Sequence, residues 1–320
     1  MKAMVQLSYG SPDVIVPRQI AKPSPRTDEL LIRIQAAKVG PSDCAFRKGE
    51  PQMIKWLYGR SRPKYPIGGT EFAGVVEAVG AGVKHFKAGD RVLGMSPRTF
   101  GAYAEYLCLS EKRPLAVIPV DVSFEEAVAV CDGGATALTF LRDLAKVRKG
   151  QNVLIYGASG AVGIYAVQLA KYYGAVVTGV CSAGNESLVR QAGADYVIDY
   201  TREDFAKADR TYDVVFDAVG KRSFSTCKRV LTAQGMYLTT APKLSIVFQM
   251  IWTSLFKGKR AMFATAGLMQ NHANLSFLLE LARNGALNAV IDRRYPLERL
   301  PDAHEYVETG RKKGNVIVTY

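Results

Sequence analysis

Apolar runs and glycine turns alternate through the middle of the chain. Residues 153–156 form a short apolar run typical of a buried strand, and three glycines follow it, Gly157, Gly160 and Gly163. After the last glycine, apolar residues recur at helical spacing as far as residue 170. Further apolar runs and a helical segment continue the series, at residues 175–180, 186–191 and 196–200. This order predicts a β-α-β-α-β series and therefore a parallel sheet.

The glycine turn between the first strand and the first helix is the candidate ligand site. Glycines allow the backbone to approach a pyrophosphate, and the free N–H groups at the start of a helix bind that anion. The spacing alone is weak, because a chain with 29 glycines contains it by chance and a tight strand–helix turn needs it too. The strand–turn–helix order favours a dinucleotide site, with a structural turn as the alternative.

The segments on either side of this series have a different pattern of apolar and turn-forming residues. Residues 1–123 contain several short strands separated by Gly, Pro and Asp, which suggests a barrel-like unit. A capping box at 123–126 opens a helix and marks the change. Further strands are expected at 212–219, 236–241 and 261–265, and the tail combines short helices with a last strand at 315–319. We therefore predict an α/β protein with a Rossmann domain at 124–267 and a β-rich domain from 1–123 and 268–320.

Composition narrows the class of protein. Hydrophobic residues make up 48% of the 320 residues and charged residues 22%, as in soluble globular proteins. The first residues do not resemble a signal peptide, the five cysteines are scattered, and the longest apolar stretch, 244–256, is too short to span a bilayer. We expect a cytoplasmic protein without a membrane span. The net charge of +13 is spread along the chain without a nucleic-acid module, so nucleic-acid binding is not expected.

Several motifs in this order resemble one known family. They are Tyr9–Asp13, Gly69–Gly80, Phe86–Val92, Gly101–Tyr106, Val153–Gly163, Gly193–Tyr200 and Gly310–Asn315. The chain resembles the medium-chain dehydrogenase/reductase superfamily, in its zinc-independent quinone oxidoreductase branch, over nearly its whole length. The resemblance implies a GroES-like catalytic domain formed by both chain ends, a central Rossmann domain and a cleft between them.

Zinc is not expected. The ligand positions of zinc-dependent relatives fall at Gly40, Thr70 and about Asp132, and none offers a thiolate or an imidazole. Cys131 precedes the third of these positions by one residue, and we interpret it as a packed core residue. No cysteine lies in the segment 94–101, where relatives carry a structural zinc lobe. The three histidines, His85, His272 and His304, match no ligand spacing, and His304 is expected to pack or to lie on the surface.

The segment after the second strand of the series bears on the choice of nicotinamide cofactor. Residues 180–185 contain no carboxylate, so nothing there repels a 2′-phosphate, and Ser182 and Asn185 can donate hydrogen bonds to it. Tyr200 is similar to a tyrosine near this phosphate in relatives, whereas Gly184 stands where they often have a basic residue; Arg190 or the cluster 311–313 could compensate. We expect NADPH, with NADH possible; a polar loop without a phosphate role is the alternative.

The full set of expected cofactor contacts comes from the glycine turn, from loops after later strands and from two more distant positions. These residues are Thr136, Gly157, Ser159, Gly160, Ala161, Val162, Ser182, Asn185, Tyr200, Ala218, Val219, Thr240, Ala241 and Asn315.

Without a Lewis acid, hydride transfer suits an acceptor that is already electrophilic, such as a quinone or an α,β-unsaturated carbonyl compound. Tyr58 and Ser42 are the candidate catalytic residues, with Tyr65 as a third polar group, and a surface or packing role is the alternative for Tyr58. Many relatives have Asn where this chain has Gly40, so a zinc-independent alcohol or aldehyde oxidoreductase and a non-catalytic NADPH-binding protein remain alternatives. Residues 244–256 are expected to form a lid, a buried helix or a subunit contact. A C2 homodimer is expected through the sheet edge at 261–265.

Overall fold

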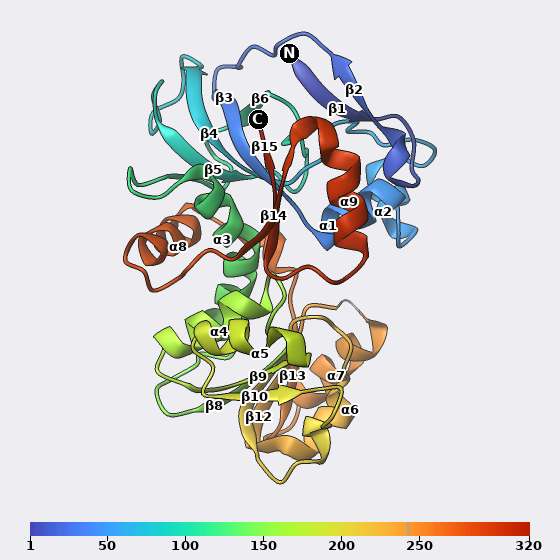
Figure 1. Cartoon of the computed structure of the whole chain (residues 1–320), viewed down its shortest axis with the longest axis vertical. Coiled ribbons are helices and arrows are strands. Elements are labelled where there is room, and N and C mark those ends of the chain that lie inside the picture. The colour runs from blue at the N-terminus through green and yellow to red at the C-terminus, as the bar shows by residue number, and fades with distance from the viewer. Residues whose placement is uncertain (242) are drawn as a thin grey trace. The chain divides into compact units, whose positions relative to one another are not determined.

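The computed structural model of the chain describes residues 1–241 and 243–320, which form two compact units (Figure 1). Unit 1 comprises Met1–Asp132, Gln270–Asn284 and Ala289–Tyr320, and unit 2 comprises Gly133–Met269 and Gly285–Asn288. Unit 1 therefore contains both ends of the chain. The helix α3 (Phe124–Leu138) crosses from one unit to the other, because Ala127–Cys131 pack in the core of unit 1 and the division falls after Asp132.

A mixed sheet forms the centre of unit 1. Its strands run in the order β14-β15-β3-β4-β5-β7, and β6 pairs with β3. Their bounds are β3 (Glu29–Val39), β4 (Glu71–Val79), β5 (Arg91–Met95), β6 (Tyr106–Ser110), β7 (Leu115–Val117), β14 (Ile291–Pro296) and β15 (Asn315–Thr319). The last strand lies antiparallel to β3, with Val316 opposite Val39. This pairing joins the two chain ends in one sheet, as the resemblance implied.

Smaller elements complete unit 1. They are the hairpin β1 (Lys2–Gln6) and β2 (Ile15–Gln19) and the helices α1 (Pro41–Lys48), α2 (Met53–Tyr58), α8 (His272–Arg283) and α9 (Leu300–Glu308). Burial alternates only in the middle of β3, where Ile32 and Ile34 are buried and Arg33 between them is exposed; Ala36–Val39 at its end are all buried. Such alternation is typical of a strand with one face in the core.

Unit 2 is built on a parallel sheet in the order β10-β9-β8-β11-β12-β13. Its strands are β8 (Asn152–Tyr156), β9 (Val176–Cys181), β10 (Tyr196–Asp199), β11 (Tyr212–Asp217), β12 (Leu231–Thr239) and β13 (Arg260–Phe263). Its helices are α4 (Gly163–Tyr172), α5 (Glu186–Gln191), α6 (Phe224–Cys227) and α7 (Leu244–Ser254). Counted along the chain, the strand order is 3-2-1-4-5-6, that of the Rossmann fold. The predicted fold is confirmed, and β13 is the predicted edge strand.

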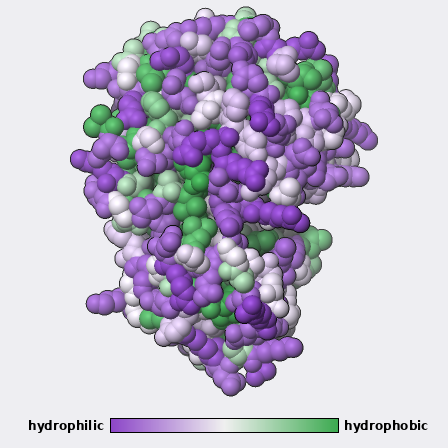
Figure 2. Space-filling model, in the orientation of Figure 1, coloured by the Kyte–Doolittle hydropathy of each residue, from purple (hydrophilic) through white to green (hydrophobic). Residues whose placement is uncertain are grey.

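The segment 244–256 forms α7, most of which is exposed. Only Ile246 and Thr253 of the helix are buried, and large apolar side chains along it face solvent. The buried-helix interpretation of this segment is therefore wrong. Within residues 1–241 and 243–320, none of the helices combines the length and the hydrophobicity needed to cross a bilayer. The face drawn in Figure 2 is mainly hydrophilic, with hydrophobic residues in separate patches.

Candidate functional site

In the glycine turn of unit 2, residues 157–163, the backbone lies very close to neighbouring groups. Gly157 has φ +78°, and a Cβ there would lie 2.1 Å from a methyl group of Val219. A Cβ on Gly163 would lie 2.1 Å from the carbonyl oxygen of Gly157, so α4 begins directly against the end of β8. Only glycine fits these two positions, and the resulting turn places the positive end of the α4 dipole beside the end of β8, where an anion is favoured.

Three of the predicted cofactor residues meet beside this turn. The Nδ2 group of Asn185 donates to Ser159 Oγ at 3.1 Å and lies 3.3 Å from Ser182 Oγ. All three side chains are neutral hydrogen-bonding groups, so none of the three would itself repel a phosphate group. The carboxylate of Asp199, at the end of the neighbouring β10, accepts from the backbone N–H and the hydroxyl of Thr201.

Other predicted groups in this region are also placed. Tyr200 is exposed, with its ring centroid 6.3 Å from that of Tyr156. The guanidinium of Arg190 pairs with Glu186 at 2.8 Å, so its charge already has a partner on α5. Thr136 lies buried in α3 of unit 2. Asn315 belongs to unit 1, where it opens β15 and donates to the carbonyl of Val290 at 3.1 Å.

Asp217 organises the loop after β11, and the sequence analysis missed it. Its fully buried carboxylate accepts from the backbone N–H groups of Val219 at 3.2 Å, Gly220 at 2.8 Å and Arg222 at 2.7 Å. The hydroxyl of Tyr237 donates to it as well. This anchor fixes the backbone at the predicted contacts Ala218 and Val219. An aspartate directly after an apolar strand was the available signal.

The loop after β12 joins the same edge of the sheet. The hydroxyl of Thr240 donates to the carbonyl of Ala218 at 3.3 Å, and the N–H of Ala241 donates to the hydroxyl of Thr239 at 3.2 Å. Because β8, β11 and β12 are neighbouring parallel strands, their carboxyl ends meet at one edge. The geometry thus brings the glycine turn and both predicted loops together, at the edge where Rossmann sheets bind nucleotides.

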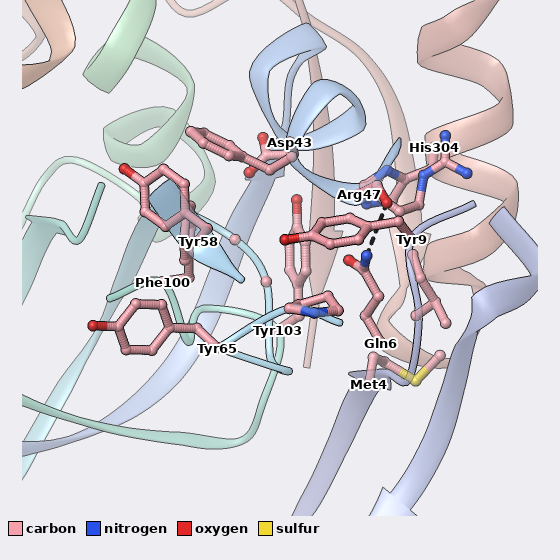
Figure 3. A pocket seen from close by; sticks show the side chains of 15 residues that line it. Met4, Gln6, Tyr9, Asp43, Arg47, Tyr58, Tyr65, Phe100, Tyr103 and His304 are labelled. Atoms are coloured by element: carbon pink, nitrogen blue, oxygen red, sulfur yellow. Dashed lines mark hydrogen bonds between the residues drawn. The ribbon is translucent and has the colours of Figure 1, made fainter. Parts of the chain in front are cut away.

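Unit 1 contains a pocket of about 30 Å³, room for roughly two water molecules (Figure 3). Figure 3 shows Tyr58, Phe100 and Tyr65 on one side and Arg47 and His304 on the other. The lining residues are Met4, Gln6, Tyr9, Ile15, Asp43, Phe46, Arg47, Tyr58, Pro63, Tyr65, Gly68, Gly69, Phe100, Tyr103 and His304.

The aromatic side of the pocket is an edge-to-face cluster. The Phe100 ring lies 4.7 Å from Phe46 and 5.2 Å from Tyr58, centroid to centroid. Tyr65 lies 6.0 Å from Phe100. The hydroxyl of Tyr58 has only a long contact of 3.5 Å, to the carbonyl of Pro97. Ser42 is exposed in the first turn of α1 and is not a lining residue, so the structure brings Tyr58 and Tyr65 together and leaves Ser42 apart.

On the polar side of the pocket, His304 is inert as an acid or base near neutral pH, whereas burial raises the pKa of Asp43, which also lines the pocket, to about 6. Burial lowers the pKa of His304 to about 3. Its Nδ1 lies 3.5 Å from Cys44 Sγ, and burial raises the pKa of that thiol to about 12. The guanidinium of Arg47 is buried and paired with Glu308. His304 therefore packs in the core, one of its two predicted roles.

A buried lysine occupies the place where zinc-dependent relatives bind the metal. Lys38 Nζ lies 2.8 Å from Asp132 Oδ2 and 3.4 Å from Glu71 Oε2. A Cβ on Gly40 would lie 3.9 Å from the same ammonium, and Thr70 donates to Glu71 at 2.6 Å. The three zinc positions thus surround an ammonium group, and their side chains do not fit a zinc ion. Among the described residues, no cluster of His, Cys, Asp and Glu could hold a metal.

The charges of this cluster depend on one another. Burial opposes the charge of Lys38, but the carboxylates of Asp132 and Glu71 outweigh it and raise the pKa of Lys38. Burial raises the pKa of Glu71 to about 8, although Lys38 lowers it. Burial also raises the pKa of Asp43 to about 6, against the N–H that Gly40 donates to it. Sequence analysis missed Lys38; a lysine inside an apolar strand was the signal.

Comparison with known proteins agrees with this geometry. Residues 26–120 match the family described as alcohol dehydrogenase GroES-like domain, and residues 192–318 match zinc-binding dehydrogenase. The chain is 32% identical over 329 residues to the chloroplastic quinone-oxidoreductase homolog of Spinacia oleracea, covering 99% of this chain and 98% of that protein. It is 33% identical to 2-methylene-furan-3-one reductase of Solanum lycopersicum, over 99% of this chain and 79% of the relative.

A solved structure extends the similarity to the whole fold. The quinone oxidoreductase of Escherichia coli, complexed with NADPH, superposes with a TM-score of 0.84 at 26% identity and full coverage of both chains. The family resemblance drawn from the sequence motifs is thereby confirmed. The chain is an oxidoreductase that belongs to the quinone oxidoreductase family of the medium-chain dehydrogenase/reductase superfamily.

Proposed function

We propose that this protein is an NADPH-dependent reductase that transfers hydride to quinones or α,β-unsaturated carbonyl compounds without a catalytic zinc. The observation that carries the proposal is the ammonium of Lys38 among the three positions that hold zinc in other relatives. An ammonium has no empty orbital for a carbonyl or alkoxide oxygen, so it cannot replace zinc as a Lewis acid. An acceptor that is already electrophilic needs no such help.

The neutral donors of unit 2 support NADPH as the cofactor. Asn185, Ser182 and Ser159 would hold the 2′-phosphate, and the N–H groups after Gly160 would hold the pyrophosphate. Ala218 and Ala241, on the loops fixed by Asp217 and Thr239, would contact the rest of the cofactor. When bound, NADPH supplies the hydride. NADH stays possible, because no cationic side chain is hydrogen-bonded within the Asn185 cluster.

The aromatic side of the unit 1 pocket supports a planar apolar acceptor. Phe46 and Phe100 offer ring edges and faces, which favour stacking with a quinone ring and exclude water. Tyr58 is the group proposed to donate a hydrogen bond, or the proton, to the acceptor oxygen as negative charge develops there. Its weak contact with Pro97 leaves the hydroxyl free to turn. Ser42 is retained as a second candidate proton donor.

The test is oxidation of NADPH by the purified, chelator-treated protein, with a simple quinone and a simple enone as separate acceptors and NADH run in parallel. Turnover with NADPH that survives chelation is the expected result. Equal rates with NADH would contradict recognition of the 2′-phosphate by unit 2, but would still support hydride transfer to a quinone or an enone. Binding of NADPH without turnover of either acceptor would refute the proposed reaction.

Two further properties belong to this proposal. We propose a C2 homodimer through the open edge of β13, because an unpaired strand edge offers a row of backbone groups to a second copy. Sedimentation as a monomer at micromolar concentration would contradict it. We propose the cytoplasm as the compartment, which the five free cysteines support, although the Spinacia relative is named as chloroplastic.

A further inference from the structure

The helix α7 is apolar on both of its faces. Its inner face is fixed on unit 2: Ile246 is buried, the N–H of Phe263 contacts Met250 Sδ at 3.2 Å, and the N–H of Ala261 donates to the hydroxyl of Thr253 at 3.2 Å. These positions, spaced by four and three residues, follow one side of a helix. Packing of the inner face therefore explains one apolar stripe and leaves the other without a structural role.

The outer face of α7 and the residues that follow it form an exposed apolar surface. We name this surface the α7 apolar face; its members are Leu244, Val247, Phe248, Ile251, Trp252, Leu255 and Phe256. Phe248 is 73% exposed and Trp252 is 67% exposed. A helix on the surface of a globular protein normally carries polar residues on its outer side. A continuous apolar surface with large aromatic residues marks an interaction site.

The chain segment that contains the α7 apolar face carries basic residues and no acidic ones, and two of its arginines, Arg222 and Arg229, pair with Asp204 and Asp209 outside it. Residues 218–279 contain no Asp or Glu, yet they contain eight basic residues: Lys221, Arg222, Lys228, Arg229, Lys243, Lys257, Lys259 and Arg260. Lys243 precedes α7, and Lys257 and Arg260 follow it with exposed side chains. The basic residues thus flank the apolar face at both ends. This segment alone supplies a charge of +8 within the chain's net +13.

We propose that the α7 apolar face, with its flanking basic residues, docks this protein onto an anionic lipid surface. Helices that lie in the membrane interface combine Trp, Phe and Leu on one face with Lys and Arg beside them. At about 16 Å, α7 is too short to span a bilayer but long enough to lie in the headgroup region. The inference does not depend on the proposed reductase activity.

Charge argues against a second copy as the occupant. A contact of α7 against α7 of a second copy, distinct from the proposed pairing of backbone groups along the β13 edge, would bring Lys243 and Lys257 of the two copies together without a carboxylate from this segment. A lipid surface offers an apolar layer for Phe248 and Trp252 and, directly above it, anionic headgroups for Lys257 and Arg260. Both features of the face are then satisfied by one partner.

The two tryptophans of the chain provide the test. Trp252 lies on the α7 apolar face, and Trp56, which is 73% exposed, lies on α2 of unit 1 and serves as the matched control. Trp56→Phe leaves Trp252 as the sole tryptophan, and Trp252→Phe leaves Trp56. Each variant is mixed with vesicles of equal parts phosphatidylcholine and phosphatidylglycerol, and with vesicles of phosphatidylcholine alone, and its emission and co-sedimentation are recorded.

We expect both variants to co-sediment with the anionic vesicles, and a blue shift of emission only where Trp252 remains. Neutralising Lys257→Gln together with Arg260→Gln should weaken binding roughly 25-fold, since each basic residue near an anionic surface contributes about fivefold. Added salt should weaken it as well. Because both side chains are exposed, the melting temperature should not change.

Three results would overturn the proposal. One is failure to bind anionic vesicles, or binding that Trp56 reports and Trp252 does not. Another is a blue shift of Trp252 that follows protein concentration without vesicles, which would identify a second copy as the occupant. The last is loss of NADPH turnover in Trp252→Ser without lipid and at unchanged melting temperature, which would make α7 part of the active site.

Discussion

Replacing Lys38 by methionine tests the buried ion cluster of unit 1. The residue is 2% exposed, and its ammonium lies between the carboxylates of Asp132 and Glu71. Methionine keeps the length and the apolar stem of the side chain and removes the charge. Two carboxylates then face each other in the interior without a cation between them.

The magnitude follows from the burial of each partner. Removing one member of a buried ion pair costs about 3–5 kcal/mol. Two features favour the low end at pH 7: the Asp132 side chain is 32% exposed, and Glu71, with a pKa already raised to about 8, can take up a proton. We expect a loss of about 3 kcal/mol at pH 7. Because Lys38 lowers the pKa of Glu71, its removal raises that pKa further, so the loss of stability continues above pH 8 in the variant. Each further pH unit up to the new pKa should add up to about 1.4 kcal/mol.

Calorimetry measures this loss directly. In a domain of this size, about 3 kcal/mol corresponds to a fall in melting temperature of roughly 6–12 °C. Hydrogen exchange in β3 and β4 assigns the change to unit 1. Lys22→Met is the control, because its pair with Glu77 is exposed and screened by water, so its loss should change stability little. A loss for Lys38→Met that equals the control, or that does not grow between pH 7 and pH 9, would refute the reasoning.

Four further predictions test the rest of the molecule. Glu71→Gln should reduce the fall in stability between about pH 4.5 and pH 8. The raised pKa of Glu71 stabilises the fold at low pH, and this contribution is lost as the pH rises towards 8. Melting temperatures measured at several pH values test this, and an unchanged dependence of stability on pH would contradict it. Asn185→Asp should raise the KM for NADPH by about tenfold or more and leave that for NADH nearly unchanged, because a carboxylate would face the 2′-phosphate; equal effects on both cofactors count against the site. Gly163→Ala should abolish NADPH binding in calorimetric titration, because its Cβ would meet the Gly157 carbonyl at 2.1 Å, whereas Gly184→Ala, with nothing within 4 Å of its Cβ, should bind normally. Tyr58→Phe should lower kcat for the quinone about a hundredfold at unchanged KM for NADPH; steady-state kinetics with an unaltered kcat would exclude it as the proton donor.

Local pattern was sufficient to predict unit 2. Its central strands β8 and β9 are almost wholly buried, so they read as unbroken apolar runs, and a glycine turn separates β8 from α4. Gly157 and Gly163 could be predicted because their positions exclude any Cβ. Asn185 and Ser182 lie three residues apart, and their meeting with Ser159 follows from the neighbouring strands β8 and β9.

Contacts between distant segments were harder to predict. Lys38 and Asp132 are 94 positions apart, and no period links a lysine in β3 to an aspartate within α3. Cys131, beside that aspartate, was correctly predicted as a core residue because its own type indicates burial. The outward face of α7 could not be predicted either, since an apolar helical segment gives the same pattern whether a core or another partner covers it.

Two of the buried charged residues, Asp217 in unit 2 and Lys38 in unit 1, are stabilised in different ways. Asp217 is satisfied by three backbone N–H groups and a tyrosine hydroxyl, so its carboxylate fixes a loop without a counter-ion. Lys38 instead forms ion pairs with two carboxylates, so its positive charge is compensated within unit 1. A zinc ion in that place would keep an open position for substrate oxygen, whereas a lysine surrounded by Asp132 and Glu71 has none. Under the proposed reaction without zinc, the acceptor itself must be electrophilic, which is the physical reason to propose a quinone or an enone in preference to a simple alcohol.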